Sequence, residues 1–116
     1  MTRVLVCGGR DYRDSARVRR VLDAVDRKYP ISVVIQGGAR GADALAKGWA
    51  QANGVHWVEY RAEWDKHGRS AGHIRNAEML NHGKPDYVVA FPGGAGTRGM
   101  IELAKKAGVP TWVVGT

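Results

Sequence analysis

The feature that most constrains the fold is a short apolar run that ends in a glycine-rich turn, because this arrangement recurs along the chain. Residues 3–7 (RVLVC) run into residues 8–12 (GGRDY), and residues 32–36 (SVVIQ) run into residues 37–43 (GGARGAD). The pattern returns at residues 87–97 (YVVAFPGGAGT). Each run has the length of a buried strand, and each turn is followed by apolar residues at helical spacing. The sequence therefore predicts repeated strand–turn–helix units.

The helices that follow the turns are amphipathic. The stripe of the first expected helix consists of Val18, Val21, Leu22, Val25 and Tyr29. Asp14 or Ser15 can cap this helix, and Pro30 ends it because proline cannot continue helical hydrogen bonding. The buried faces of two later helices are predicted to hold Ala42, Leu45, Ala46 and Trp49, and Met100, Leu103, Ala104 and Ala107.

The rest of the chain supplies two more strands and one more helix. Residues 56–60 (HWVEY) mix polar with aromatic side chains, as a strand at the edge of a sheet would, and residues 111–114 (TWVV) predict a last strand. Residues 61–69 (RAEWDKHGR) show no clear period and predict a connecting loop that could act as a lid. A helix is expected to begin after it, near Ser70 or Ala71.

Five strands that alternate with four helices predict an α/β fold. Right-handed crossovers place helices on both faces of a parallel sheet, so residues 1–116 are expected to form one domain, a Rossmann-like three-layer sandwich. In the strand order 3-2-1-4-5, the order reverses between the first and fourth strands, and ligands bind such sheets at that point. The turns at residues 8–12 and 92–97 should therefore flank a crevice.

The turn at residues 93–97 (GGAGT) is predicted to bind an anion, and phosphate in particular. Three glycines among four residues let a ligand approach the backbone, and the helix that starts there directs unpaired N–H groups at the same place. The alternative is a tight strand-to-helix turn that binds nothing.

Composition favours an anionic ligand in a reducing compartment. The chain has 18 Lys and Arg against 11 Asp and Glu, a net charge of +7, which suits a phosphorylated metabolite or a nucleic acid. The single cysteine, Cys7, cannot form an intramolecular disulfide and is interpreted as a small buried residue rather than a nucleophile. Because no apolar run is long enough to cross a membrane, we expect a cytoplasmic protein without a membrane partner.

Several common nucleotide-enzyme motifs are missing. The sequence has no dinucleotide fingerprint after its first strand, no phosphate-binding G-x-x-x-x-G-K-[ST] loop and no G-x-S-x-G nucleophile turn. His67 and His73 stand without acidic or cysteine ligands around them, so no metal site is predicted. No cofactor is expected to be required.

The combined motifs resemble the SLOG superfamily, a Rossmann-like group that includes the Smf/DprA proteins and the LOG phosphoribohydrolases. The match covers nearly the whole chain and is most similar to the YspA/YpsA-like branch. It rests on residues 8–11 (GGRD), 37–43 (GGARGAD), 71–79 (AGHIRNAEM) and 91–97 (FPGGAGT). The resemblance implies a pocket for a nucleotide or nucleotide-derived ligand, such as a nucleoside monophosphate or an ADP-ribose-like molecule. The ligand-binding residues that it implies are Gly8, Gly9, Arg10, Gly37, Gly38, Arg40, Arg75, Asn76, Gly93, Gly94, Gly96 and Thr97.

The same resemblance bears on catalysis. LOG enzymes carry P-G-G-x-G-T-x-x-E, and the position that matches their catalytic glutamate is Met100, whereas Arg75 matches the arginine that works with it. Hydrolysis of an N-glycosidic bond normally needs a carboxylate, so LOG-type activity is doubted and the catalytic residues are left open, with Asp11, Asp43 and Arg75 as candidates. The alternative role for the two aspartates is to cap the backbone that follows them.

Two other functions are kept open. The motifs at residues 38–43 and at Arg75 also resemble DprA, which implies a module that binds single-stranded nucleic acid. SLOG relatives commonly form dimers, so we expect a homodimer or a higher homo-oligomer, with Trp49, Trp57 and Trp64 as possible interface residues.

Overall fold

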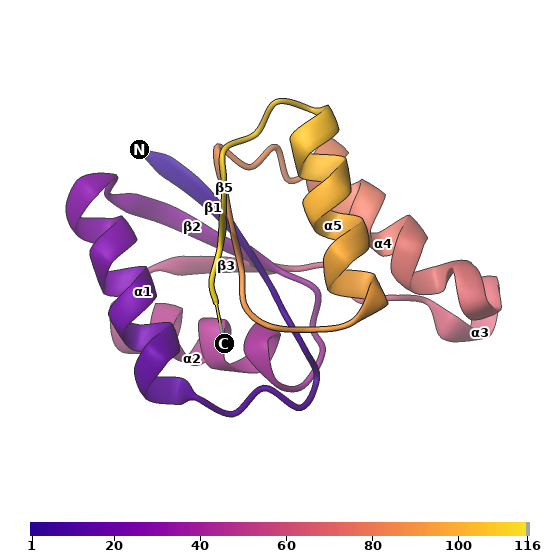
Figure 1. The fold of residues 1–116 in the computed structure, drawn as a ribbon, viewed down its shortest axis with the longest axis horizontal. Helices are drawn as coiled ribbons and strands as arrows, with labels where there is room; N and C mark the ends of the chain where they lie inside the picture. Colours follow the sequence, from indigo (N-terminus) through magenta and orange to yellow (C-terminus); the bar gives the residue numbers. More distant parts are fainter. Residues whose placement is uncertain (116) are drawn as a thin grey trace.

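The computed structural model describes residues 1–115, and a five-stranded sheet runs through its centre (Figure 1). Every neighbouring pair of strands is parallel, and the order is β3-β2-β1-β4-β5. The strands are β1 (Thr2–Cys7), β2 (Ile31–Gln36), β3 (His56–Glu59), β4 (Tyr87–Ala90) and β5 (Thr111–Val113). This order confirms the predicted Rossmann-like α/β fold and places β3 at an edge.

The helices are α1 (Ser15–Lys28), α2 (Ala42–Ala52), α3 (Trp64–His67), η1 (Gly68–Ser70), α4 (Ala71–Asn81) and α5 (Ala95–Lys106). The segment expected to be a loop thus forms two short helical turns, α3 and the 3-10 helix η1, which lead directly into α4. The connecting-loop prediction was wrong because an isolated turn of helix is too short to leave a periodic signal. In the described chain no helix has both the length and the apolar character needed to cross a membrane.

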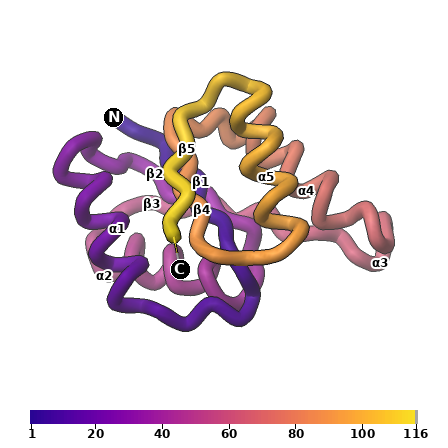
Figure 2. The backbone as a smooth tube through the Cα atoms, viewed as in Figure 1, coloured from indigo at the N-terminus to yellow at the C-terminus, as the bar shows by residue number. Residues whose placement is uncertain are grey.

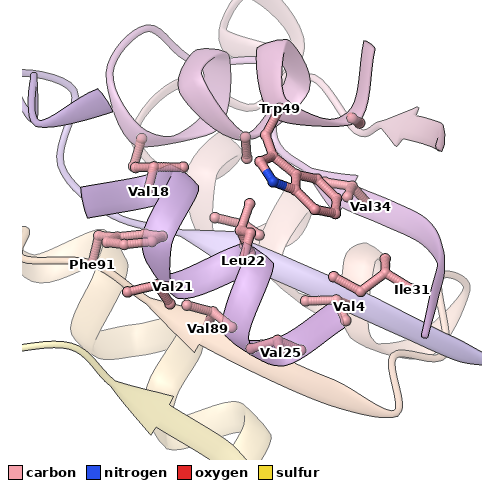
Figure 3. Close-up of a cluster of buried hydrophobic side chains, with 14 of the residues drawn as sticks. Val4, Val18, Val21, Leu22, Val25, Ile31, Val34, Trp49, Val89 and Phe91 are labelled. Carbon is pink, nitrogen blue, oxygen red and sulfur yellow. The ribbon is translucent and has the colours of Figure 1, made fainter. Parts of the chain in front are cut away.

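The helices cover both faces of the sheet because side chains of each central strand alternate between two cores. Val4 and Val6 of β1 pack with α1 and α2, whereas Leu5 and Cys7 pack with α4 and α5. Figures 1 and 2 show these two pairs of helices on opposite sides of the strands. Figure 3 shows the first core, in which Leu22 lies between α1 and the sheet.

Tyr29 departs from the buried stripe predicted for α1, whereas Trp49 lies in the buried face predicted for α2 and differs only from its possible role at an interface. Tyr29 follows the end of α1 and is 43% exposed, so the buried stripe of that helix ends at Val25. Trp49 is buried and its indole Nε1 donates to Asp23 Oδ1 at 2.9 Å, which joins α2 to α1. Trp49 therefore belongs to the core and cannot supply an intermolecular interface, because its ring is already packed inside the domain.

The glycine turns after β1, β2 and β4 meet at the carboxyl edge of the sheet. Gly9 N–H donates to Pro92 C=O at 2.9 Å, and Ala42 N–H donates to Gly9 C=O at 3.1 Å. A Cβ on Gly8 would lie 2.6 Å from the Cβ of Ala42 and 2.9 Å from that of Phe91. Only glycine therefore fits at position 8, where two turns and a strand end converge.

A pair of glycine substitutions tests this packing. Gly8→Ala should lower the free energy of unfolding by about 1–3 kcal/mol, because its Cβ overlaps two neighbouring Cβ atoms. The matched control is Gly48→Ala in the interior of α2, where a Cβ meets no described atom within 4 Å. That variant should gain roughly 0.5–1 kcal/mol from helix propensity. Urea denaturation measures both, and equal effects at the two positions would contradict the packing argument.

Candidate ligand-binding cleft

A cleft of about 550 Å³ opens at the carboxyl edge of the sheet, between the turn after β1 and the start of α5. It lies where the strand order reverses, as predicted, because β1 has β2 on one side and β4 on the other. α4 supplies a further wall, and α3 and η1 extend it outward. Among the polar side chains that line the cleft are Arg10, Asp43, Arg69, His73, Arg75, Asn76 and Thr97.

Arg75 is the central cation of this cleft. Its Nη1 donates to Gly37 C=O at 2.9 Å and its Nε donates to Asn76 Oδ1 at 3.0 Å. These two contacts hold the guanidinium group at a fixed angle, while Nη2 has no protein acceptor within the described part of the chain. Burial lowers the pKa of Arg75 from its usual value, and the nearby Asp43 opposes that change. The group keeps its charge, since arginine has a very high intrinsic pKa.

Asn76 connects Arg75 to the start of α5. Besides accepting from Arg75, its side chain donates from Nδ2 to Gly96 C=O at 3.1 Å, and the residue is buried. The N-cap residue of α5 is Gly94, which has no side chain that could cap the helix. The first N–H groups of α5 are therefore available to a ligand, beside a helix dipole that favours negative charge.

Asp43 is a buried carboxyl at the base of the cleft. Its Oδ2 accepts from the N–H groups of Gly37 at 3.2 Å and Ala39 at 3.3 Å, so it caps the turn that precedes it rather than the backbone that follows it. Burial raises its pKa from 3.8 to about 6, although the backbone bonds and Arg75 act in the opposite direction. Asp43 therefore carries a proton in a fraction of molecules at mildly acidic pH.

Cys7 also lines the cleft, but its thiol is unreactive. Burial, reinforced by the negative charge of Asp43, raises the pKa of Cys7 to about 12. A nucleophilic cysteine needs its thiolate form, which is negligible at neutral pH with such a pKa. This agrees with the interpretation of Cys7 as a small buried residue.

Trp64 and Arg10 form the outer rim of the cleft. The Arg10 guanidinium carbon lies 5.2 Å from the centre of the Trp64 ring, a cation–π contact, and Trp64 is 47% exposed. Sequence reasoning identified Arg10 but missed Trp64, Arg69 and His73 as cleft residues. For Trp64 and Arg69 the available signal was their place in residues 61–69, the possible lid, because α3 and η1 are too short to show a period. His73 lies in α4, two residues before Arg75.

The structure brings together most of the residues that the resemblance implied. The cleft is lined by Gly8, Gly9, Arg10, Arg75, Asn76, Gly94, Gly96 and Thr97 from that set. Gly37, Gly38, Arg40 and Gly93 lie outside it. Of the catalytic candidates, Asp43 and Arg75 line the cleft, whereas Asp11 is exposed and pairs with Arg40 at 3.2 Å on the surface.

The glycines outside the cleft support its walls. A Cβ on Gly37 would clash with the Arg75 guanidinium group, and a Cβ on Gly93 would clash with Thr97 Oγ1 and approach Gly9 N to 2.7 Å. In contrast, a Cβ on Gly94 meets no described atom within 4 Å, so this residue presents open backbone to the cleft. In the region that the structure describes, no three His, Cys, Asp or Glu side chains form a metal-binding group.

The fold and the cleft define a Rossmann-like α/β domain with a positively charged site at its topological switch point. Residues 2–67 match the family described as the YspA, cpYpsA-related SLOG family. The chain is also 42% identical over 118 residues to the gene 61 protein of Mycobacterium phage D29, in an alignment that covers 95% of this chain and 94% of that protein. This chain belongs to the YspA, cpYpsA-related SLOG family, which confirms the resemblance noted in the sequence.

The raised pKa of Asp43 predicts a pH dependence of stability. A carboxyl whose pKa is raised in the folded state favours folding below its unfolded pKa, and that advantage is lost as the pH rises through its folded pKa. From 3.8 to about 6, the loss amounts to about 3 kcal/mol. Asp43→Asn keeps an oxygen acceptor for Gly37 and Ala39 but cannot ionise. Its advantage in unfolding free energy over the unmodified chain should therefore grow between pH 4 and pH 7.

Urea denaturation at intervals of one pH unit measures this difference. Comparing the two proteins at each pH removes the contribution of other groups, such as Glu59, whose pKa is lowered mainly by its hydrogen bond with Gln36. Parallel stability curves for the two proteins would show that the folded state does not raise the pKa of Asp43.

Proposed function

We propose that this protein binds a nucleotide or a nucleotide-derived ligand, such as a nucleoside monophosphate or an ADP-ribose-like molecule, with one phosphate between Arg75 and the start of α5. The observation that carries the proposal is the restrained guanidinium group of Arg75, which lines the cleft, is held by Gly37 C=O and Asn76 Oδ1, and has Nη2 without a protein acceptor among the described residues. A cation fixed before the ligand arrives loses little conformational entropy on binding. Membership of the SLOG family supports a nucleotide-related ligand.

The cleft also offers a surface for the rest of such a ligand. Trp64 exposes an aromatic face at the rim, and stacking on an aromatic ring suits any nucleobase. His73 and Arg69 line the same wall and add hydrogen-bond donors. The volume of about 550 Å³ lies within the usual range of small-molecule sites.

We infer binding rather than LOG-type hydrolysis. Met100, at the position of the LOG glutamate, is fully buried and packs with the core between the sheet and α5. Within residues 1–115 the one carboxyl that lines the cleft is that of Asp43, and its Oδ2 is engaged by two backbone N–H groups. Asp43 thus has a structural role in the turn before α2, and the LOG position holds no carboxylate, so ligand sensing fits this site better than turnover.

Replacing Arg75 tests the binding site. Arg75→Gln should weaken AMP or ADP-ribose binding by about 1.5–3 kcal/mol, because a charge-assisted contact to phosphate is lost. The matched control is Arg27→Gln, which removes the same charge from an exposed position in the last turn of α1. Titration calorimetry measures affinity, and thermal melts without ligand show how far the lost contacts to Gly37 and Asn76 affect stability.

Two further measurements make this test decisive. Gly94→Val should fold, since the position faces open space, yet should lose binding because its side chain occupies the expected phosphate position. Affinity should depend weakly on salt, whereas single-stranded nucleic acid bound along several phosphates would dissociate steeply as salt rises. Unchanged nucleotide affinity in folded Arg75→Gln and Gly94→Val would refute the proposed site.

Turnover is tested separately. The protein should release no more than traces of free base from nucleoside 5′-monophosphates, because losing a general acid or base typically removes about 10² to 10⁴ in rate. Chromatography after incubation detects base and ribose phosphate, with Asp43→Asn beside the unmodified chain. Rapid release that disappears in Asp43→Asn would establish an enzyme and assign its acid or base to Asp43.

A further inference from the structure

A second compartment of about 340 Å³ adjoins the cleft on the side of β2 and β3. The residues that line both spaces are Arg10, Ala39, Trp64 and Arg75. The other lining residues are Gly37, Gly38, Arg40, Arg61 and Ala62. The two spaces therefore meet at the Arg10–Trp64 pair and at the guanidinium group of Arg75.

Arg61 lines the second compartment but not the cleft. A network of hydrogen bonds through Glu59 and Gln36 orients its side chain. Its Nε donates to Glu59 Oε2 at 2.7 Å, and the other carboxylate oxygen of Glu59 accepts from Gln36 Nε2 at 2.9 Å. Gln36 is fully buried, and its Oε1 accepts the N–H of Gly38. The chain of contacts fixes Glu59 and, through it, the base of the Arg61 guanidinium group.

Arg61 and Arg75 are held in similar ways on either side of one glycine turn. Each uses Nε in a hydrogen bond with a neighbouring side chain, and Arg75 also binds Gly37 C=O. A Cβ on Gly38 would lie 2.8 Å from Arg61 Cγ, just as a Cβ on Gly37 would meet Arg75. Both amino groups of Arg61 have no protein acceptor among residues 1–115, and the side chain is 72% exposed.

The charge of the second compartment favours an anion. Four arginines line it, and no described lining residue is acidic. Glu59 lies behind the wall and is already paired with Arg61 and, at 3.7 Å, with Lys47. Arg40 is exposed and pairs with Asp11, so it belongs to the rim. Arg61 is thus the best placed of these cations to receive an anionic group that extends from the cleft.

We propose that Arg61 binds a second phosphate group of the same ligand, so that the protein selects nucleotides with two phosphates over nucleoside monophosphates. This inference rests on the proposed function, because it assumes that the first phosphate lies beside Arg75. The second phosphate can come from a pyrophosphate link, as in a nucleoside diphosphate sugar, or from a phosphodiester, as in a dinucleotide. A pyrophosphate link places the second anion directly beside the 5′-phosphate proposed to bind Arg75, and a phosphodiester places it on the far side of the ribose.

Three adenine ligands test the proposal by calorimetry. AMP carries one phosphate, ADP-ribose carries a pyrophosphate, and the 5′-phosphorylated dinucleotide pApA carries a phosphodiester. At least one of the two larger ligands should bind about tenfold or more tightly than AMP. Arg61→Gln should abolish that gain and leave AMP affinity within about twofold, while Arg27→Gln should change neither. Which larger ligand loses affinity identifies the source of the second phosphate.

The outcomes separate this inference from the proposed function. If AMP binds and depends on Arg75, but neither larger ligand gains affinity or the gain survives Arg61→Gln, the second phosphate site is refuted and the cleft stands. If Arg61→Gln weakens AMP as much as the larger ligands, Arg61 serves the first phosphate and the inference also fails. If none of the three ligands binds, both proposals fall. Thermal melts should show no loss of folding in Arg61→Gln, because the side chain is exposed.

Discussion

The close approach of three glycine turns at the carboxyl edge of the sheet is the constraint on which this structure depends. Gly9 receives a hydrogen bond from Ala42 N–H and donates one to Pro92 C=O, so the turns after β1, β2 and β4 form one connected layer. Side chains at Gly8 or Gly41 would push this layer apart, since a Cβ there meets neighbouring atoms at once. The backbone thereby surrounds a cleft without side chains filling it.

The charged groups of Asp43 and Arg75 lie beside these turns, and their burial lowers the stability of the fold. Burying Asp43 raises its pKa, and burying Arg75 lowers its pKa, which means that each charged form is less well solvated than in water. Their hydrogen bonds to the backbone of the glycine turns offset part of this cost. Perturbed pKa values cluster at functional sites, which supports the proposed binding role of this cleft.

Met100, at the position that matches the LOG glutamate, is a core residue. Its side chain fills the space between Leu5, Met79 and Ala104, and a carboxylate there would lose its hydration without gaining a partner. Restoring a glutamate at this position therefore changes the packing of α5 as well as the chemistry. The restrained arginine beside this core supports the proposed role of the cleft in binding.

Much of this protein could be predicted from its sequence, because apolar period and glycine position are local signals. They determined the five strands and the four long helices, and the strand order of a Rossmann-like fold then placed the crevice between Gly8 and Gly94; the structure contains all of these. Tertiary structure alone decided which side chains face that crevice. Trp64 lines it, Arg61 lines the adjoining compartment, and the Trp49 indole bonds to Asp23, because these contacts join segments distant in sequence. Spacing along one helix predicts which face is buried but carries no information about contacts with other segments, since these form only when the layers pack.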